Sequence, residues 1–315
     1  MSNKIVHVVA AAIENSEGNI LIAKRPPHVH QGGLWEFPGG KVEDNEKPYA
    51  ALTRELLEEC DILAQDFSPL IQITHHYPDK SVFLDVMHVK SFSGNAIGNE
   101  GQTIKWVKKE ELDQYQFPKA NKPIIDALVL PPNYLITPDY PVEDSDLLLG
   151  TLEKKLVSGI KLIQLRAKQL DDEQFFQLYV EVNRLTEKYG ATLFSNMSTK
   201  FAEKNGIKRI HLTADRLQKL SPLKNDVIYS ASCHNQKEIE KACQLGVQFI
   251  VIAPVKKTTT HPETTPLGWD KFQALCKLST VPVYALGGMC KQDMPEVIQR
   301  GGQGIAAISS LWNGE

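Results

Sequence analysis

The chain has 315 residues, of which 42% are hydrophobic and 23% charged, and its formal net charge is −3. This composition is typical of globular domains, and the length predicts about two of them. The negative net charge argues against a protein that holds duplex nucleic acid through its phosphates. The five cysteines are scattered without a C-x-x-C pair, which excludes a disulfide framework and a four-cysteine zinc site. No apolar run reaches the ~18 residues of a membrane span, so we expect a protein of the reducing cytoplasm.

The first 130 residues predict a mixed α and β domain. Strand-like stretches are expected at 5–14, 19–25, 81–90 and 103–107. Helices are expected at 48–60, where Pro48 is tolerated in the first turn, and at 122–130. The two prolines that follow cannot continue the second helix, so we place a linker at 131–133 between domains 1–130 and 134–315.

The second domain alternates short apolar strands with helical stretches. The expected strands are 134–137, 161–166, 192–195, 209–212, 227–230, 249–252, 283–286 and 304–308. Eight such strands with crossover helices predict a parallel (β/α)8 barrel, smaller than the typical ~250 residues. An open doubly wound sheet is the alternative.

Three carboxylates crowd one side of the expected helix 48–60, because Glu55, Glu58 and Glu59 are three and four residues apart. Tyr49, Leu52 and Leu56 share a second stripe, which we expect to be buried. Carboxylates this close raise one another's pKa unless a cation lies between them, and Mg2+ prefers such oxygen ligands. A solvated acidic helix face is the alternative interpretation.

The spacing around this helix favours the metal site. Gly40, Glu46 and the run Arg54-Glu55-Leu56-x-Glu58-Glu59-x-x-Ile62 resemble the Nudix box, the signature of enzymes that cleave nucleoside diphosphates linked to another group. Asp61 stands where this family usually has glycine. The position ends the helix, and aspartate tolerates a left-handed cap.

The resemblance covers nearly all of residues 1–130 and is strongest to the MutT-type Nudix hydrolases, the 8-oxo-dGTP diphosphatases that sanitise the nucleotide pool. It is carried by residues 25–30, 34–40, 77–79, 98–102 and 117–123. The resemblance implies that Asn121 reads the oxidised guanine, since an amide donates and accepts at once. A turn or helix cap is the alternative role for Asn121. The resemblance also implies which other groups face the nucleotide: Arg25, His30 and the backbone of Phe37, Pro38 and Gly39.

The same resemblance implies a mechanism. Mg2+, or Mn2+ in its place, would neutralise the triphosphate and acidify a water that attacks a bridging phosphorus, giving the monophosphate and pyrophosphate. The implied metal ligands are the carbonyl of Gly39 and the carboxylates of Glu55, Glu58, Glu59 and Glu100. We take Glu55 as the general base, although any of the clustered carboxylates could accept the proton. Arg54 is expected to pair with Glu46.

Residues 134–315 resemble thiamine phosphate synthase and its TenI-like relatives. The motif Gln164-x-Arg166-x-Lys168 is followed, in the family's order, by Ser232-x-His234, 253–260, Gly287-Gly288 and Ile308-Ser309. Period-two alternation places the first three polar side chains on one face, at the carboxyl end of a barrel strand. We expect a phosphate cradle of backbone amides and a cationic pair. Its residues are Gln164, Arg166, Lys168, Gly287, Gly288 and Ser309.

The catalytic residues of the synthases are not all matched. Met197 and Arg216 stand at the places of two metal-binding aspartates, although Asp215 is adjacent, and His261 replaces a lysine. No histidine of the TenI-type tautomerases is evident near 253–254. Since methionine cannot replace a hard oxygen ligand, we expect a degenerate barrel that binds a phosphorylated, thiamine-related ligand without making thiamine phosphate.

Three functional hypotheses follow. The first is an 8-oxo-dGTP diphosphatase that carries the degenerate barrel. In the second, the first domain hydrolyses thiamine-related pyrophosphates that the barrel delivers. In the third, the barrel is a ligand sensor or docking module that regulates the first domain, or it retains residual synthase activity.

Overall fold

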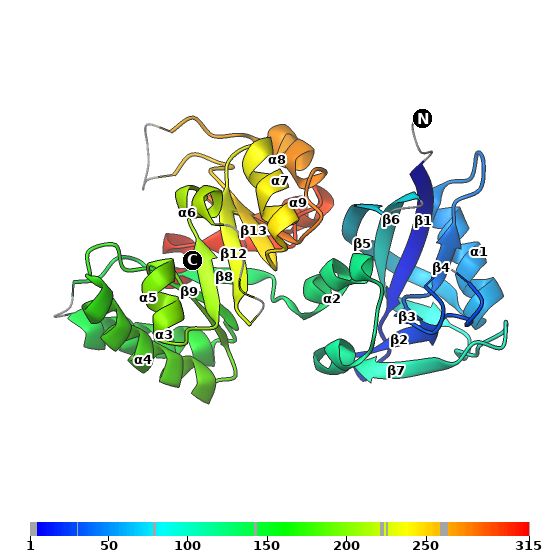
Figure 1. The fold of residues 1–315 in the computed structure, drawn as a ribbon, viewed down its shortest axis with the longest axis horizontal. Coiled ribbons are helices and arrows are strands. Elements are labelled where there is room, and N and C mark those ends of the chain that lie inside the picture. The colour runs from blue at the N-terminus through cyan, green and yellow to red at the C-terminus, as the bar shows by residue number, and fades with distance from the viewer. Residues whose placement is uncertain are drawn as a thin grey trace. The chain divides into compact units, whose positions relative to one another are not determined.

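The computed structural model describes residues 5–29, 31–77, 80–141, 144–220, 224, 226–258 and 264–314. Six residues named above lie outside these ranges: His30, Pro78, Asp79, Thr259, Thr260 and His261. The chain divides into two compact units, Met1–Val129 and Leu130–Glu315 (Figure 1). Among the described residues, no helix combines the length and the apolar composition needed to cross a membrane.

The first unit contains a four-stranded sheet in the order β4-β1-β6-β5 and a three-stranded sheet in the order β3-β2-β7. Its strands are β1 (Ile5–Ile13), β2 (Asn19–Lys24), β3 (Trp35–Glu36), β4 (Gly39–Lys41), β5 (Leu63–His76), β6 (Ser81–Ser93) and β7 (Ile104–Lys108). Its helices are α1 (Pro48–Cys60), α2 (Lys122–Val129) and the 3-10 turns η1 (Lys109–Gln114) and η2 (Lys119–Asn121).

Strand β1 is buried on both faces, which explains its nearly unbroken apolar sequence. Ala10 and Ala12 belong to one hydrophobic cluster, whereas Val9 and Ala11 belong to a second cluster that includes Leu56 of α1. Alternate side chains of a strand point to opposite faces, so one strand serves both cores. Helix α1 packs beside β1 and β4, and this fixes its acidic side relative to the glycines of β4 (Figure 1).

Helix α1 has the expected bounds and ends as predicted. Asp61 adopts a left-handed conformation with φ +54°, and its N–H donates to the carbonyl of Leu57 over 3.2 Å. The expected buried stripe is confirmed for Leu52 and Leu56 but is wrong for Tyr49, which is 46% exposed and stacks on Phe67. Tyr49 lies in the first turn of the helix, where its ring covers an edge strand and remains in contact with solvent.

Strand β5 was not expected from the sequence. It lies at the edge of its sheet, and its pairing with β6 shifts register at three places between Ala64 and Ile71. These irregularities interrupt the period-two alternation, and most of its side chains are at least partly exposed. The segment therefore carries no clear strand pattern.

The second unit is a closed parallel barrel with strand order β10-β11-β12-β13-β14-β15-β8-β9, which confirms the (β/α)8 prediction over the open sheet. Its strands are β8 (Asn133–Ile136), β9 (Leu162–Leu165), β10 (Thr192–Ser195), β11 (Arg209–Leu212), β12 (Ile228–Cys233), β13 (Phe249–Ile252), β14 (Val283–Ala285) and β15 (Gly304–Ala307). Its helices are α3 (Ser145–Val157), α4 (Asp172–Lys188), α5 (Thr199–Lys204), α6 (Ala214–Lys219), α7 (Gln236–Leu245), α8 (Trp269–Cys276) and α9 (Met294–Gln299), with short turns η4 (Lys291–Asp293) and η5 (Ser310–Gly314).

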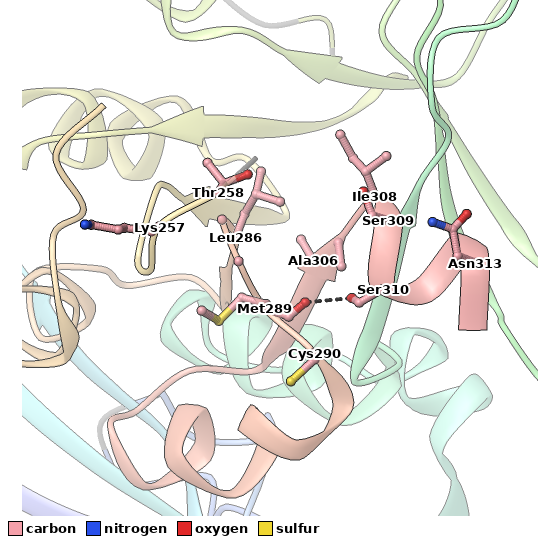
Figure 2. A pocket seen from close by; sticks show the side chains of 13 residues that line it. Lys257, Thr258, Leu286, Met289, Cys290, Ala306, Ile308, Ser309, Ser310 and Asn313 are labelled. Carbon is pink, nitrogen blue, oxygen red and sulfur yellow. Dashed lines mark hydrogen bonds between the residues drawn. The ribbon is translucent and has the colours of Figure 1, made fainter. Parts of the chain in front are cut away.

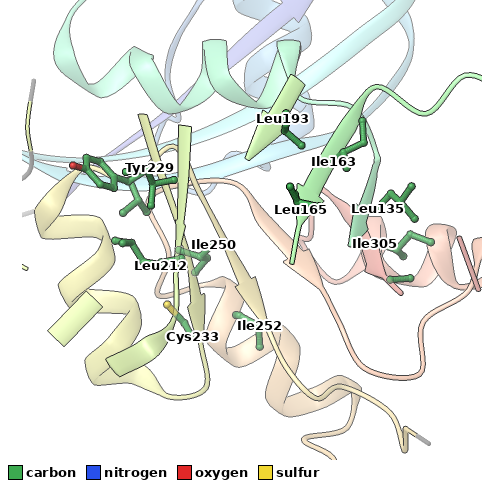
Figure 3. Close-up of a cluster of buried hydrophobic side chains, with 14 of the residues drawn as sticks. Leu135, Ile163, Leu165, Leu193, Leu212, Tyr229, Cys233, Ile250, Ile252 and Ile305 are labelled. Carbon is green, nitrogen blue, oxygen red and sulfur yellow. The ribbon is translucent and has the colours of Figure 1, made fainter. Parts of the chain in front are cut away.

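The barrel strands bury side chains in two layers. Four aromatic rings fill the interior in a cluster formed by Tyr134, Phe194, Phe249 and Tyr284. The alternate residues, such as Leu135 and Ile163, belong to the larger cluster between the strands and the surrounding helices (Figure 3). Because parallel strands are buried on both faces, their sequences are short continuous runs of apolar residues.

The two prolines after α2 pack within the barrel unit. The carbonyl of Pro131 accepts from the hydroxyl of Tyr284, and that of Pro132 accepts from the N–H of Ile305 over 2.9 Å. Strand β8 then begins at Asn133, one residue before the expected start.

Candidate functional site

A hollow of about 420 Å³ in the first unit brings together residues that are distant in the sequence. Its walls come from β1, β4, β6, the loop after β2 and the segment before α2. The predicted site residues among its lining are Arg25, Phe37, Gly39, Glu59, Glu100 and Asn121. Three of the five implied metal ligands therefore face the same cavity as the implied base reader, whereas Glu55 and Glu58 are not among its lining residues.

Glu59 is the carboxylate of α1 that lines this hollow. It accepts a hydrogen bond from the N–H of Gly39 over 3.1 Å. The pKa of Glu59 is raised to about 7: burial is the main cause, the hydrogen bond from Gly39 opposes it, and the nearby carboxylates of Glu36, Glu55 and Glu100 add to it. A cation bound beside Glu59 would therefore stabilise the ionised form of its carboxyl group.

Glu55 lies against the glycine pair of β4. A Cβ added at Gly40 would approach the carboxyl carbon of Glu55 to 2.2 Å, so a larger residue would displace this carboxylate. Gly39 adopts φ +146°, and a Cβ there would lie 2.2 Å from the carbonyl oxygen of Val9. The two glycines thus let β4 pass between β1 and the acidic side of α1.

Arg54 connects the acidic residues of the motif. Its Nε and Nη2 donate to the two carboxylate oxygens of Glu46 over 3.0 and 2.9 Å, which confirms the expected pair. Its Nη1 donates to Glu55 over 2.8 Å and to Glu58 over 3.3 Å. The hydrogen bonds to Glu46 and Glu55 hold the pKa of Arg54 above its usual range. The guanidinium therefore orients three carboxylates.

The donor set fits a hard divalent cation, because it consists of carboxylate and carbonyl oxygens. Among the described residues, no three His, Cys, Asp or Glu side chains are arranged to close on one metal ion. Instead Glu55 and Glu58 bond to Arg54 and Glu59 bonds to Gly39. Glu100 is exposed, but the side chain of Gln102 donates to the carbonyl of Glu59 over 2.9 Å and ties this turn to the end of α1.

Glu36 also lines the hollow, although it was not predicted to be a site residue. Its carboxylate is bound to the guanidinium of Arg25, and burial raises its pKa although Arg25 lowers it. Its position in the apolar run Leu34–Phe37 is the one signal that could have marked it. The pair places a charged donor and an acceptor side by side in the wall of the hollow.

The remaining predicted nucleotide contacts differ in their roles. Phe37 is buried and stacks on Phe117 with ring centroids 5.4 Å apart. The carbonyl of Pro38 accepts from the N–H of Ala11 over 2.8 Å, which is a contact within the fold. The side chain of Asn121 lines the hollow and makes no hydrogen bond to the described residues, so it does not cap α2 there.

A second hollow, of about 350 Å³, lies at the carboxyl ends of β14 and β15 in the barrel (Figure 2). Gly287, Gly288 and Ser309 line it, together with Lys257 and Thr258. Gly288 has φ +64°, and a Cβ there would lie 2.3 Å from the carbonyl oxygen of Lys257. The hydroxyl of Ser310 donates to the carbonyl of Met289 over 2.6 Å and closes this turn.

The other three expected cradle residues do not line this hollow. Arg166 donates to the carboxylate of Asp139 over 2.7 Å, and the N–H of Lys168 donates to the same carboxylate over 2.8 Å. Gln164 is buried, and its Oε1 has no hydrogen-bond partner among the described residues. It lies on the same face of β9 as Leu162, which belongs to the barrel interior.

Met197 and Arg216, which stand where the resemblance implies metal-binding aspartates, make other contacts in the structure. Met197 is 1% exposed and belongs to the hydrophobic cluster outside the barrel strands. Arg216 donates from Nη1 to the carbonyl oxygens of Asn196 and Met197 over 2.8 and 2.6 Å. Nearby, His211 is held between the hydroxyls of Ser230 and Ser232 at 2.9 Å each, and burial lowers its pKa to about 3.

Comparisons with known proteins agree with this division. A family model described as thiamine monophosphate synthase matches residues 133–311, and a model described as NUDIX domain matches residues 9–127. The putative thiamine-phosphate synthase 2 of Aquifex aeolicus is 33% identical over 166 residues, which cover 51% of this chain and 88% of that protein.

The first unit has relatives of its own. The CTP pyrophosphohydrolase of Escherichia coli is 39% identical over 126 residues, covering 40% of this chain and 93% of that protein. The 8-oxo-dGTP diphosphatase of the same organism is 35% identical over 125 residues, covering 40% and 97%. The chain therefore belongs to the thiamine monophosphate synthase family through its barrel, and that barrel is fused to a Nudix hydrolase domain of the MutT type.

Proposed function

We propose that the Nudix domain is a Mg2+-dependent pyrophosphohydrolase that converts 8-oxo-dGTP to 8-oxo-dGMP and pyrophosphate, and so sanitises the nucleotide pool. The observation that carries this proposal is that Glu59, Glu100 and Asn121 line one hollow of about 420 Å³. A cavity of this size accommodates a small molecule. The 35–40% identity to proteins named 8-oxo-dGTP diphosphatase supports the same reaction class.

The residues of the hollow and the adjoining acidic side of α1 have different roles, some toward the phosphates and some toward the base. Mg2+, held by the carbonyl of Gly39 and by Glu55, Glu58, Glu59 and Glu100, would neutralise the phosphates and acidify the attacking water. Glu55 would accept a proton from the attacking water as general base, and Nη1 of Arg54 holds its carboxylate through a hydrogen bond of 2.8 Å. Phe37, which stacks on Phe117, provides an apolar wall for the base, and Asn121 reads the edge of the base.

CTP is the competing substrate, because the more similar of the two Escherichia coli relatives is named CTP pyrophosphohydrolase. Cytosine also presents a donor and an acceptor, so the amide of Asn121 alone does not separate the two bases. The ion pair of Arg25 and Glu36 adds a second donor and acceptor that a larger, oxidised purine could engage.

Steady-state kinetics of the whole chain on 8-oxo-dGTP, dGTP, CTP and thiamine diphosphate, in Mg2+ and in EDTA, test the proposal. We expect turnover in Mg2+ only, with the highest kcat/KM on 8-oxo-dGTP. Glu59→Gln should abolish it, while the exposed Glu110→Gln, which lies outside the hollow, serves as the matched control. Near-normal turnover by folded Glu59→Gln would contradict the metal assignment, and faster hydrolysis of thiamine diphosphate would favour a thiamine-related role.

For the barrel we propose binding of a phosphorylated, thiamine-related ligand without synthesis of thiamine phosphate. Two observations support it: the glycine-lined hollow after β14 and β15, and the buried Oε1 of Gln164, which has no hydrogen-bond partner in the part of the chain that the structure describes. Met197 is buried in the hydrophobic cluster and Arg216 bonds to the backbone, so neither position supplies a carboxylate to a metal ion. The barrel would then deliver this ligand to the Nudix domain, or it would act as a ligand sensor that regulates the Nudix domain.

This second proposal is tested in full-length Glu59→Gln, so that the Nudix domain does not consume the substrates. We expect no thiamine phosphate from the pyrimidine pyrophosphate, the thiazole phosphate and Mg2+, and robust synthesis would restore a bifunctional enzyme. Calorimetric titration with thiamine phosphate should show binding, and silence at millimolar ligand would contradict a ligand site in the barrel.

A further inference from the structure

The turn 98–102 of the first unit carries Glu100 and lies between β6 and β7, outside the helices and strands. A Cβ added at Gly98 would lie 2.0 Å from the carbonyl oxygen of Gln102, so the turn closes tightly on itself. Glu100 is exposed, yet it lines the same hollow as Glu59. The place of the Glu100 carboxylate therefore depends on what fixes this turn to the rest of the domain.

The end of helix α1 provides that attachment. The last carbonyls of a helix have no hydrogen-bond donor within the helix, and here the neighbouring segment supplies the donors. The N–H of Asn99 donates to the carbonyl of Glu59 over 3.0 Å. The N–H of Ile97 donates to the carbonyl of Cys60 over 3.1 Å. The turn is thus built onto the end of the helix that carries the acidic side of the site.

Gln102 joins two residues that the resemblance implies as metal ligands. Its side-chain Oε1 accepts from the N–H of Glu100 over 2.9 Å, and its Nε2 donates to the carbonyl of Glu59 over 2.9 Å. Glutamine can make both bonds because its amide contains an acceptor and a donor group. Gln102 is partly buried and is not among the residues that line the hollow, so any effect on the site passes through these two partners.

We propose that Gln102 is a positioning residue of the metal site, which sets the affinity for Mg2+ by holding the main chain of Glu100 at a fixed place relative to Glu59. The inference rests on the proposed function, because it takes both glutamates as metal ligands. Among the described residues, the carboxylates are not closed on one metal ion. The free protein therefore prepares the spacing of the two chain segments, and the side chains turn to the cation when it binds.

Two physical reasons favour an effect on affinity. Ionised carboxylates that face one hollow repel each other before a cation arrives, and a turn tied by Gln102 cannot move away to relieve this repulsion. Residues outside the ligand shell that orient metal ligands typically contribute about 10- to 100-fold to metal affinity. Loss of the Gln102 amide should therefore weaken metal binding although Gln102 itself does not contact the metal.

Calorimetric titration of the metal-free, full-length protein with Mg2+, without nucleotide, tests this inference. Gln102→Met nearly keeps the length of the side chain but removes both hydrogen bonds, and it should raise Kd for Mg2+ at least about tenfold. Gln102→Asn keeps the amide but is one methylene shorter, so it should give an intermediate Kd. Gln65→Met is the matched control and should leave Kd unchanged, since exposed Gln65 lies on the edge strand β5 and accepts only from the hydroxyl of Ser91.

A double variant separates positioning from a general loss of structure. If Gln102 acts through Glu100, Gln102→Met should raise Kd by no more than about threefold in a Glu100→Gln background, where that ligand is already lost. Equal increases in both backgrounds, or an unchanged Kd in Gln102→Met, would overturn the positioning role. The same comparison with Gln102→Asn replaces a Met variant that does not fold. Absence of Mg2+ binding by the wild type would instead contradict the metal assignment of the proposed function, and this inference with it.

Discussion

Asn121 and Glu59 line the same hollow, but their side chains have different surroundings. Asn121 keeps both its donor and its acceptor free of described partners, as a residue that reads a base edge requires. Glu59 is held by the N–H of Gly39 in a place where burial raises the pKa of its carboxyl group to about 7. These surroundings agree with the roles proposed above, a contact to the base for Asn121 and a metal ligand for Glu59.

Replacing Asn121 should change selectivity more than overall activity. A lost amide pair at a buried base edge costs about 1–3 kcal/mol, so Asn121→Ala should lower kcat/KM for 8-oxo-dGTP about 5- to 150-fold relative to dGTP. The ratio of the two kcat/KM values, measured for wild type and variant, checks this. Equal losses on both nucleotides would assign Asn121 a structural role before α2.

The raised pKa of Glu59 predicts a pH-dependent stability in the absence of metal. Between its usual value of 4.5 and about 7, folded Glu59 holds a proton that the unfolded chain has released. The free energy of unfolding therefore falls as pH rises through this window, by on the order of 2–3 kcal/mol. Glu59→Gln removes the effect, so its stability relative to wild type should be greater at pH 8 than at pH 5.

Urea denaturation in EDTA at these two pH values provides the measurement. Addition of Mg2+ at pH 8 should stabilise wild type more than Glu59→Gln, because the cation favours the ionised carboxylate. A difference between variant and wild type that is the same at both pH values would show that Glu59 ionises as an ordinary surface carboxylate.

At the scale of elements, helix α1 and strand β4 together define the acidic side of the Nudix site. The helix supplies Glu55, Glu58 and Glu59, while the glycines of β4 let the chain pass within contact of Glu55. Arg54 then fixes the carboxylates from the opposite side. The termination of α1 at Asp61 matters because Gln102 ties the loop that carries Glu100 to the last turn of this helix.

Glycine at the end of α1 should stabilise the Nudix domain. Asp61 adopts φ +54°, a conformation that glycine reaches without the steric cost of a Cβ. Asp61→Gly should raise the free energy of unfolding by about 0.5–1 kcal/mol, measured by denaturant titration. Lys277→Gly at the end of α8, where φ is −62°, is the control and should not stabilise the protein. A loss of stability in Asp61→Gly would show that the aspartate side chain contributes more than its strain costs.

At the scale of the whole molecule, the two units have separate hydrophobic cores. Two clusters lie on the faces of β1 in the Nudix domain, while the barrel has an aromatic interior and an outer layer under its helices. We therefore expect each unit to unfold as its own cooperative body.

A cavity in the barrel interior should destabilise the barrel alone. Phe249 is fully buried, with ring centroids 5.1 Å from those of Tyr134 and Phe194, so Phe249→Ala should cost about 3–5 kcal/mol. Scanning calorimetry should show one of two transitions shifted, with nucleotide hydrolysis at 25 °C unchanged. Leu52→Ala in α1 should shift the other transition. Movement of both transitions by either variant would indicate one cooperative unit.

The sequence by itself determined the features that depend on neighbours within a few residues. Helical spacing placed three carboxylates on one side of α1, period-two and continuous apolar runs located the barrel strands, and the left-handed end at Asp61 followed from its position in the motif. These patterns are set by local backbone geometry, and the structure retains them. Strand β5 was not predicted, because its bulges and its position at the edge of the sheet removed the alternation of buried and exposed side chains.

Only the tertiary structure decided which distant side chains meet. The pairing of Arg25 with Glu36, the bond between Gln102 and Glu59, and the capture of Arg166 by Asp139 join residues 11, 43 and 27 positions apart. Closure of the barrel likewise separated Gln164, Arg166 and Lys168 from the glycines after β14, although all six were expected to form one cradle. Such contacts depend on how whole elements pack, because burial and ion pairing act between surfaces that no short stretch of sequence contains.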